Sequence, residues 1–196
     1  MIAAVVLSAG ESSRMGRPKA LLPIQGQTFL ERIVAALTEA GLRQIFVVLG
    51  HNAESMAGEI AHLPVNLLVN PDYCKGQLSS LQVAVRQLLA DEDCRGMLVH
   101  LVDHPYIDAD LVNLLLQRFQ TSGKLIVLPR FHGKRGHPVI FARSLFEELL
   151  RAPLDEGAKA VVNAHRAETL EVDTADEGIT VDIDTPELYR QYVKGD

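Results

Sequence analysis

Short apolar runs alternate with longer amphipathic segments along the first two thirds of the chain. The apolar runs are nearly continuous, which is typical of strands that helices cover on both faces. They span residues 2–7, 45–49, 65–69, 97–102 and 125–128. Between the runs, apolar residues recur at helical spacing over residues 28–40, 79–89 and 111–119. The alternation predicts an α/β fold with three layers and a mostly parallel sheet, whose ligands lie beyond the carboxyl ends of the strands.

The last third of the chain changes character. Shorter strand candidates at 139–141, 169–172 and 179–183 surround two predicted helices at 145–151 and 155–164. This part predicts a small antiparallel C-terminal addition, either as an edge of the sheet or as a lobe that closes over the site. No Ser-, Gly- or Pro-rich linker and no repeat of fixed period interrupts the sequence, so we expect a single domain over residues 1–196.

Composition and charge narrow the classes of function. The 196 residues are 47% hydrophobic and 22% charged, which is the profile of a globular chain. Because 19 Lys and Arg stand against 25 Asp and Glu, the net charge is −6 and there is no overall basic field for nucleic acid. Cys74 and Cys94 do not form a paired CxxC motif, which argues against a disulfide framework and a structural zinc site.

The apolar runs are also short. None approaches the roughly 20 residues that a membrane helix needs. The chain enters an apolar stretch at once, without a charged leader or a small-residue cleavage site. We therefore expect a cytoplasmic protein with no membrane and no nucleic-acid partner.

The first apolar run leads into a loop of small residues that carries three cations, Arg14, Arg17 and Lys19. Small residues let backbone N–H groups approach an anion closely while the cations neutralise it. Neither common phosphate motif is present, because Lys19 does not directly follow a Gly and Ser12 stands where the second Gly of GxGxxG would be. A flexible turn with solvated charges explains any one of these residues, but the whole string after a buried strand favours a phosphate-binding loop.

Residues 7–23, LSAGESSRMGRPKALLP, resemble the N-terminal signature of the MobA-like nucleotidyltransferases, approximately L-A-A-G-x-S-x-R-M-G-x-x-K. The departure is Ser8 in place of Ala. Three later segments resemble the family pattern in order: KGQLSSL at 75–81 with Gln77 in place of Met, VDHP at 102–105 with Val102 in place of Gly, and DIDTPE at 182–187. DIDTPE and the GHPV at 136–139 are similar to segments of the molybdenum-cofactor cytidylyltransferases.

This resemblance implies a Rossmann-like nucleotidyltransferase fold of the nucleotide-diphospho-sugar transferase type. It also implies a reaction in which an acceptor phosphate attacks the α-phosphorus of a nucleoside triphosphate and pyrophosphate leaves. The implied substrates are CTP, or GTP as in the guanylyl-type members, and a molybdopterin-type acceptor, with Mg²⁺ as the cofactor. Because an acceptor phosphate is largely ionised at neutral pH, positioning and charge neutralisation should matter more than a strong base.

The resemblance also assigns residues to roles. Lys19 and Arg14 are expected to neutralise the departing phosphates, and Asp103 is the third catalytic residue. The residues that bind the nucleotide are expected to be Leu7, Ala9, Gly10, Arg14, Lys19, Gly76 and Ser80. A second interpretation makes Gly76 and Ser80 the turn and cap of the helix at 79–89. Both roles are compatible, since a helix N-terminus attracts anions.

Two carboxylates are candidate metal ligands. Asp103 and Asp184 each follow an apolar run, which places both at strand ends on the ligand side of the sheet. Their oxygens suit Mg²⁺, which proteins commonly hold with one or two carboxylates plus substrate phosphates. Alternatively, Asp103 begins a turn and Asp184 caps a helix that begins near Pro186. The family pattern favours the metal role for both.

The most basic short segment is FHGKRGH at 131–137. It is either a solvated hairpin tip or a flap whose Arg135 or His137 contacts the phosphate of the acceptor. His100 and His104 have the i, i+4 spacing of a zinc helix, but His100 lies inside an apolar run and Pro105 follows His104. They therefore do not share a helical face, and we expect His100 in the core and His104 beside the site.

Two other functions are compatible with these residues. A sugar-phosphate or polyol-phosphate nucleotidyltransferase shares the N-terminal loop and the chemistry but takes another acceptor. A nucleotide- or cofactor-binding accessory protein, such as an insertion partner of a molybdoenzyme, binds without turnover. The retention of Arg14, Lys19, Asp103 and Asp184 favours an enzyme.

Overall fold

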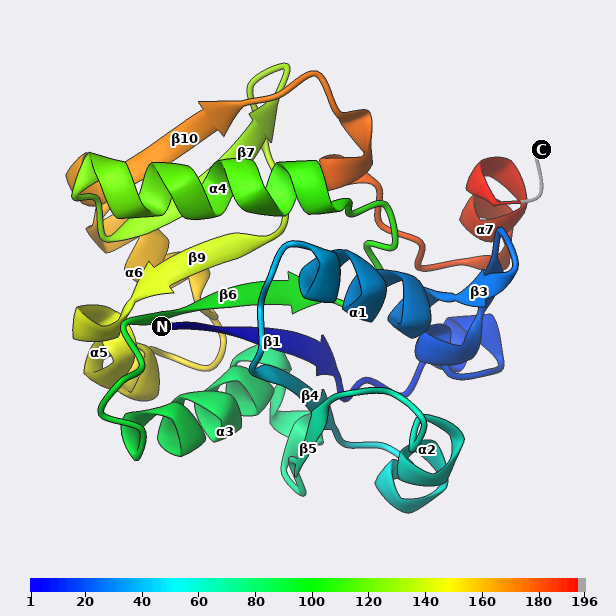
Figure 1. Cartoon of the computed structure of the whole chain (residues 1–196). Helices are drawn as coiled ribbons and strands as arrows, with labels where there is room; N and C mark the ends of the chain where they lie inside the picture. The colour runs from blue at the N-terminus through cyan, green and yellow to red at the C-terminus, as the bar shows by residue number, and fades with distance from the viewer. Residues whose placement is uncertain (194–196) are drawn as a thin grey trace.

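An eight-stranded sheet forms the centre of the computed structural model, which describes residues 1–193 (Figure 1). Its strands follow the order β10-β7-β9-β6-β1-β4-β5, with β8 paired to β7 outside this path. The strands are β1 Ile2–Ser8, β4 Ile45–Leu49, β5 Asn66–Val69, β6 Gly96–Leu101, β7 Ile126–Phe131, β8 Lys134–Arg135, β9 Val139–Ala142 and β10 Thr169–Asp173.

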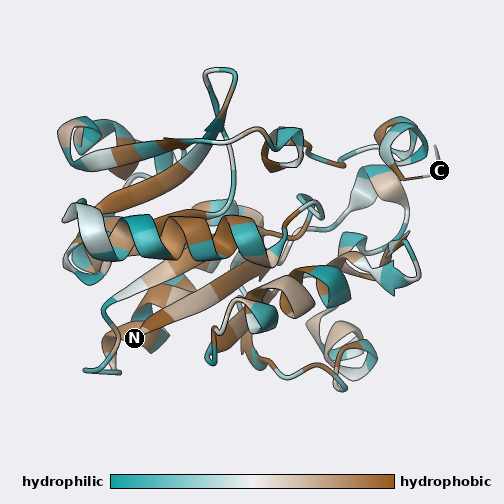
Figure 2. Cartoon of the chain, turned by 45° about the horizontal axis from the view of Figure 1, so that its top comes forward, coloured by the Kyte–Doolittle hydropathy of each residue, from teal (hydrophilic) through white to brown (hydrophobic). Residues whose placement is uncertain are grey.

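Helices cover both faces of the sheet and produce three layers (Figure 1). One face carries α1 Phe29–Glu39, α2 Ala53–Glu59 and α4 Ala109–Ser122. The other face carries α3 Gln77–Leu89, α5 Phe146–Arg151 and α6 Lys159–Ala164. Figure 2 shows the hydrophobic central strands and the hydrophilic outer stripes of the helices, as amphipathic helices on a buried sheet require.

The central strand β1 shows how the sequence builds two cores. Successive side chains of a strand point to opposite faces. Ala4 and Val6 therefore pack with α1 and α4, whereas Ala3 and Val5 pack with α3. All four side chains are fully buried, which explains why the run reads as continuously apolar instead of alternating.

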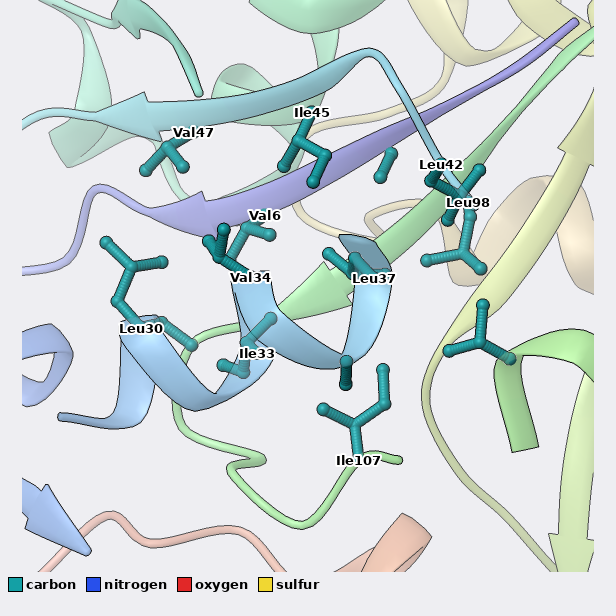
Figure 3. Packing of buried hydrophobic residues seen from close by; sticks show 14 of the residues in the cluster. Val6, Leu30, Ile33, Val34, Leu37, Leu42, Ile45, Val47, Leu98 and Ile107 are labelled. Carbon is teal, nitrogen blue, oxygen red and sulfur yellow. The ribbon is translucent and has the colours of Figure 1, made fainter. Parts of the chain in front are cut away.

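The packing of α1 on the sheet follows helical spacing. Figure 3 shows Leu30, Ile33, Val34 and Leu37 of α1 grouped beside Val6 of β1. Residues at i, i+3, i+4 and i+7 share one helix face, so one stripe of the predicted helix supplies these contacts. The helix thereby supports the end of β1, from which the loop with the three cations departs.

The direction of the strands confirms the α/β class. β1 pairs in parallel with β4 and β6, β4 pairs in parallel with β5, and β10 pairs in parallel with β7. β9 runs antiparallel to both β6 and β7 and lies between them. A short antiparallel pair also forms, by β2 Pro23–Ile24 and β3 Gln27–Thr28. The antiparallel pairs thus involve β9 inside the sheet, β8 beside β7 and the separate β2–β3 pair, whereas the edge strand β10 is parallel.

Residues 179–183 do not form the strand that their alternating pattern predicted. They begin in a 3-10 turn, Glu177–Thr180, and continue as extended chain. Val181 and Ile183 are buried against Phe29 and the β2–β3 pair instead of in the sheet. The amide of Ile183 donates to the carbonyl of Asp103 at 2.9 Å. This tether holds residues 182–184 beside the end of β6, and the chain then enters α7 Pro186–Tyr192.

Other boundaries also differ from the predicted ones. α2 was not predicted, because Met56 is its single buried residue and leaves little periodic signal. The predicted helix at 155–164 begins only at Lys159, since Gly157 has a left-handed φ of 70° that interrupts the helix. Among residues 1–193, no helix has both the length and the apolar character needed to cross a membrane.

Candidate active site

The loop after β1 reverses across the carboxyl edge of the sheet. Ser12 and Gly16 have left-handed φ values of 53° and 68°, which turn the chain sharply. The carbonyl of Ser12 accepts a hydrogen bond from the amide of Met15 at 2.9 Å. Its hydroxyl accepts one from the amide of Lys19 at 3.2 Å. The loop is therefore held by hydrogen bonds of its own backbone and of the Ser12 hydroxyl, which fix the position of Lys19 at its end.

A cavity of about 440 Å³ lies between this loop, the ends of β1 and β6, and the start of α3. Its size is typical of a small-molecule site, for which about 300–1,000 Å³ is usual. Nine of the residues expected in the site line it together, namely Leu7, Ala9, Gly10, Arg14, Lys19, Gly76, Ser80, Asp103 and Asp184. The structure thus brings together the predicted nucleotide, phosphate and metal residues, while their roles stay predictions.

Two cations and two carboxylates meet on one side of the cavity. The ammonium of Lys19 donates to Asp103 Oδ2 at 3.0 Å and also to Asp184 Oδ1. The guanidinium of Arg14 donates to Asp184 Oδ2 at 2.5 Å. Lys19 is the most enclosed of these groups, with 13% of its side chain exposed, whereas 66% of Arg14 is exposed. Asp103 and Asp184, which are 81 positions apart, therefore contact the same ammonium group.

Burial and charge oppose each other at this cluster. Burial lowers the pKa of Lys19, but the charges and hydrogen bonds of Asp103 and Asp184 outweigh it and hold the pKa above its usual value. Burial raises the pKa of Asp184, yet Lys19 and Arg14 bring the net pKa below its ordinary value. Both groups are therefore charged at neutral pH.

Asp182 belongs to the same cluster, although it was not among the predicted site residues. Desolvation of its carboxyl and the negative charges of Asp103 and Asp184 raise the pKa of Asp182 to about 6, against the opposing effect of Lys19. A carboxylate surrounded by like charges is a common feature of metal and phosphate sites. Asp184 thus lines the cavity, whereas Asp182 lies beside it, with a carboxylate oxygen within 4.8 Å of ligand atoms of Asp103 and His104. Ile183 between the two acids is buried.

Three histidines pack behind Asp103. His100 is a core residue, as the apolar context predicted, and its Nε2 donates to the carbonyl of His104 at 2.8 Å. The rings of His104 and His137 are 5.0 Å apart. Burial lowers the pKa of His100 to about 3 and that of His137 to about 4, and it also lowers the pKa of His104. The cluster is uncharged at neutral pH and adds no repulsion to a cation.

The opposite side of the cavity is formed by the start of α3. Gly76 precedes the helix with a φ of 99°, a conformation that favours glycine. The amide of Asn70 donates to the hydroxyls of Ser79 and Ser80, at 2.8 and 2.9 Å. Ser79 also donates to the carbonyl of Gly76 at 2.7 Å. Ser80 is therefore oriented by a buried amide, and the helix start faces the cavity.

Further residues of the lining were missed by the sequence analysis. His51 and Tyr73 line the cavity and are joined by a 3.2 Å hydrogen bond. Gly50 allows this arrangement, because a Cβ there would lie 2.5 Å from the Cβ of Tyr73 and 2.6 Å from the carbonyl oxygen of Ala9. No family segment and no periodicity marks this turn in the sequence, and only its position after β4 could have indicated it.

The two predicted acceptor residues lie outside the cavity lining. Arg135 lies on β8 and donates to Glu171 Oε1 at 2.5 Å. His137 is enclosed beside His104, and its backbone amide donates to the carbonyl of Ile179 at 3.1 Å. Their contact with an acceptor stays a prediction.

The donor set at the carboxylate side fits a divalent metal ion. Asp103, His104 and Asp182 each offer a ligand atom, and these atoms lie within 4.8 Å of one another. Asp103 Oδ1 is buried and accepts no hydrogen bond from residues 1–193. Carboxylate oxygens are preferred ligands of Mg²⁺ and similar ions. The bound ammonium of Lys19 also shows that this side of the cavity attracts positive charge.

The fold is a three-layer α/β fold, whose ligands bind at the carboxyl edge of the sheet, and there the cation-bearing loop faces paired carboxylates. The chain belongs to the MobA-like NTP transferase family, whose model matches residues 4–169. The resemblance noted in the sequence is thereby confirmed.

The chain is similar to several curated proteins along most of its length. It is 30% identical over 199 residues to nicotine blue oxidoreductase of Paenarthrobacter nicotinovorans, covering 96% of this chain and 95% of that protein. It is 27% identical over 184 residues to the molybdenum cofactor cytidylyltransferase of Escherichia coli K12, covering 93% and 91%. Relatives of similar length thus carry both transferase and oxidoreductase names.

Solved structures show the same architecture. Rv0371c from Mycobacterium tuberculosis H37Rv has a TM-score of 0.81 and 28% identity, with 98% of this chain and 97% of that chain covered. A structure of the same mycobacterial protein in complex with manganese has a TM-score of 0.77 and 26% identity, with 100% and 99% covered. The predicted Rossmann-like fold class is confirmed.

Proposed function

We propose that this chain is a single-domain, cytoplasmic, Mg²⁺-dependent nucleotidyltransferase that transfers CMP from CTP to a molybdopterin-type phosphate acceptor and releases pyrophosphate. One observation carries this proposal. Lys19 extends from a hydrogen-bonded loop into a cavity and contacts both Asp103 and Asp184 there. A polyphosphate needs fixed cations, and a divalent ion needs carboxylates, so this cluster supplies both within one small site.

In the proposed transfer, side chains and backbone groups of the first loop bind the phosphates in different ways. Lys19 and Arg14 bind the β- and γ-phosphates and neutralise the charge that develops on the leaving pyrophosphate. Backbone amides near Ala9 and Gly10 hold the phosphates, because the small side chains allow close approach. The acceptor phosphate is already largely ionised and attacks the α-phosphorus in line, so this mechanism assigns no residue as a general base.

The nucleoside binds on the other side of the cavity in this proposal. Leu7 and Ala9 offer backbone groups to the base, while Gly76 and Ser80 contact the nucleoside at the start of α3. The hydroxyl of Ser80 already has a fixed orientation through Asn70. A preset hydroxyl discriminates better than a mobile one, because an analogue that lacks its partner leaves a polar group unpaired.

Asp103 and Asp184 are the proposed ligands of the divalent ion. When bound, the ion neutralises the triphosphate and helps to orient it. In the described structure Asp184 is engaged by Lys19 and Arg14. An arriving triphosphate competes for these two cations, and Asp184 is then available as a ligand. Nucleotide binding thus releases Asp184 from its ion pairs and completes the set of metal ligands.

The choice of CTP and of a molybdopterin-type acceptor rests on sequence segments. GHPV at 136–139 and DIDTPE at 182–187 resemble the cytidylyl-type members, and the similarity to the cytidylyltransferase of Escherichia coli supports the same choice. The relative named as an oxidoreductase raises a different reaction class. The paired cations and carboxylates support phosphate chemistry better, and the first loop lacks the GxGxxG pattern of dinucleotide sites.

A two-stage experiment tests the proposal. Thermal shifts are measured with CTP, GTP, ATP and UTP, each with and without Mg²⁺, because ligand binding to the folded state raises the melting temperature. Pyrophosphate release is then measured with molybdopterin, a sugar phosphate or a polyol phosphate as the acceptor. We expect the largest shift with CTP and Mg²⁺, and release with molybdopterin. Pyrophosphate release only with a sugar or polyol phosphate would show that the acceptor is not molybdopterin. Nucleotide binding without any pyrophosphate release would overturn the proposed enzymatic activity and favour a nucleotide-binding protein.

A further inference from the structure

Asp103 uses only one of its two carboxylate oxygens in the contacts of the described chain. Oδ2 accepts from the ammonium of Lys19 at 3.0 Å. Oδ1 is buried and has no hydrogen-bond partner among residues 1–193. A buried carboxylate oxygen without a partner is costly. A cation next to Oδ1 would remove this cost.

His104 lies next to this unpaired oxygen. Its Nε2 is 3.9 Å from Asp103 Oδ1, which is too long for a hydrogen bond. The buried Nδ1 of the same ring also has no partner in the part of the chain that is described. Asp103 Oδ1 and His104 Nε2, both of which can bind a metal ion, thus lie 3.9 Å apart without a hydrogen bond between them. Ligands at 2.0–2.2 Å from a common ion are separated by about 3–4.4 Å, so this distance matches a shared ion.

Asp182 offers the third donor. Its carboxylate, the Asp103 carboxylate and the His104 ring present atoms that lie within 4.8 Å of one another. The backbone fixes this arrangement, because the amide of Ile183 donates to the carbonyl of Asp103 at 2.9 Å. On the other side, His100 donates to the carbonyl of His104 at 2.8 Å. Both segments that supply ligands are therefore tethered to the end of β6.

We propose that Asp103, His104 and Asp182 form a divalent-cation site in the nucleotide-free protein, and that the imidazole nitrogen makes it prefer first-row transition-metal ions over Mg²⁺. This inference rests on the proposed function, because it concerns the metal of the same site. Imidazole suits transition metals, whereas Mg²⁺ prefers oxygen ligands and retains its water. Asp184 has no part in this resting site, since Lys19 and Arg14 already engage it.

The test uses the full-length protein, freed of metal with a chelator and without nucleotide. Mn²⁺ is titrated and the free ion is measured by electron paramagnetic resonance, and Mg²⁺ is then added as a competitor. Pulsed spectra of the bound Mn²⁺ report whether a nitrogen ligand is present. We expect one bound Mn²⁺ per chain, ¹⁴N modulation in the spectra, and at least tenfold weaker binding of Mg²⁺.

Variants separate His104 from the other histidines. We expect His104→Gln to abolish the ¹⁴N modulation and to weaken Mn²⁺ binding by about 10–100-fold, and Asp182→Asn to weaken it similarly. The matched control is His62→Gln, which removes an exposed imidazole 2.9 Å from the carboxylate of Glu31. This control should bind Mn²⁺ like the wild type. The ¹⁴N signal of the wild type itself needs no variant, so the test stands even where a substitution disturbs folding.

Two results overturn the inference: bound Mn²⁺ without ¹⁴N modulation, or wild-type affinity in a folded His104→Gln. Neither result affects the proposed function, which is tested by pyrophosphate release with Mg²⁺. Conversely, the protein could bind Mn²⁺ through nitrogen and release no pyrophosphate from any nucleotide. This result would support the metal site and contradict the proposed transferase activity. The two failures are thus distinguishable.

Discussion

Two clusters of basic and acidic side chains lie in this molecule, and their charges are matched differently. At the sheet edge, Arg130 donates to both oxygens of Asp173, at 2.8 and 3.0 Å, and also to Glu171 at 3.0 Å. Arg135 donates to Glu171 as well. Each charge of this edge cluster has an opposite partner. In the cavity, by contrast, Asp103 keeps a buried oxygen without a partner in the described chain.

The pKa shifts show the same contrast. Hydrogen bonds to Asp173 raise the pKa of Arg130, and those from Arg130 lower the pKa of Asp173. Both shifts mean that the folded state favours the charged forms. In the cavity, desolvation and the carboxylates of Asp103 and Asp184 raise the pKa of Asp182 to about 6. Unmatched acids are characteristic of functional sites, where the missing positive charge comes with the ligand.

The largest effect is expected at the cation that holds the cavity cluster together. Lys19→Ala should lower turnover by about 10²–10³-fold, because a fixed donor to the developing charge is lost. Pyrophosphate release from CTP with Mg²⁺ and the acceptor measures this. The matched control is Lys134→Ala, which removes an exposed lysine on β8 and should retain full turnover. Wild-type turnover in a folded Lys19→Ala protein would contradict the proposed role of the loop.

The sequence predicts where strands lie along the chain, but it does not predict in which direction each strand runs in the sheet. Asp103 and Asp184 were both expected at strand ends, which meet on one edge of a parallel sheet. Residues 179–183 form no strand before Asp184, however, and the hydrogen bond from Ile183 to Asp103 brings it to the site instead. An apolar run carries no direction, however, and the antiparallel placement of β9 inside the sheet was therefore not predictable. The alternation at 179–183 was a real burial signal, but Val181 and Ile183 bury against Phe29 and not in the sheet.

His104 was expected beside the site, and its ring lies next to Asp103, with Nε2 3.9 Å from Oδ1. Asp182, by contrast, was missed for a physical reason. Asp182 looked like part of a strand candidate. Its role became visible only through the hydrogen bond between Ile183 and Asp103, a contact between segments that no local pattern encodes.

A smaller effect is expected for Arg135, which belongs to the edge cluster and is also a predicted contact of the acceptor. Arg135→Ala should raise the KM for the acceptor about threefold, the size of one exposed ion pair, and leave the KM for CTP unchanged. The reason is the prediction that Arg135 contacts the acceptor phosphate, for which it has to leave Glu171. Steady-state kinetics with each substrate varied in turn give the answer. An unchanged KM for the acceptor would place Arg135 wholly in the edge cluster.

Removing an acid from the cavity should stabilise the metal-free protein. Asp182→Asn is expected to raise the melting temperature at pH 8 by about 2–4 °C in the presence of a chelator, because a carboxylate that is partly desolvated and repelled by Asp103 and Asp184 disappears. The folded-state pKa of Asp182 lies above its ordinary value, so stability falls as the pH rises from about 4 through 6. The gain should therefore be full at pH 8 and shrink toward pH 4. An equal gain in melting temperature at pH 4 and pH 8 would contradict this cost of the charged carboxylate.

The opposite sign and the smallest effect are expected for the same substitution at the sheet edge. Asp173→Asn removes a carboxylate that Arg130 binds through two hydrogen bonds, so the melting temperature should fall. The side chain is 73% exposed, and water and salt screen such a pair, which limits the decrease to about 1 °C. Measurement in 1 M NaCl is the control, since screening should remove most of the difference. Turnover should be unchanged, because Asp173 is not part of the cavity lining. A stabilised Asp173→Asn would show that the edge cluster is as poorly matched as the cavity, and the distinction between a structural and a functional cluster would then fail.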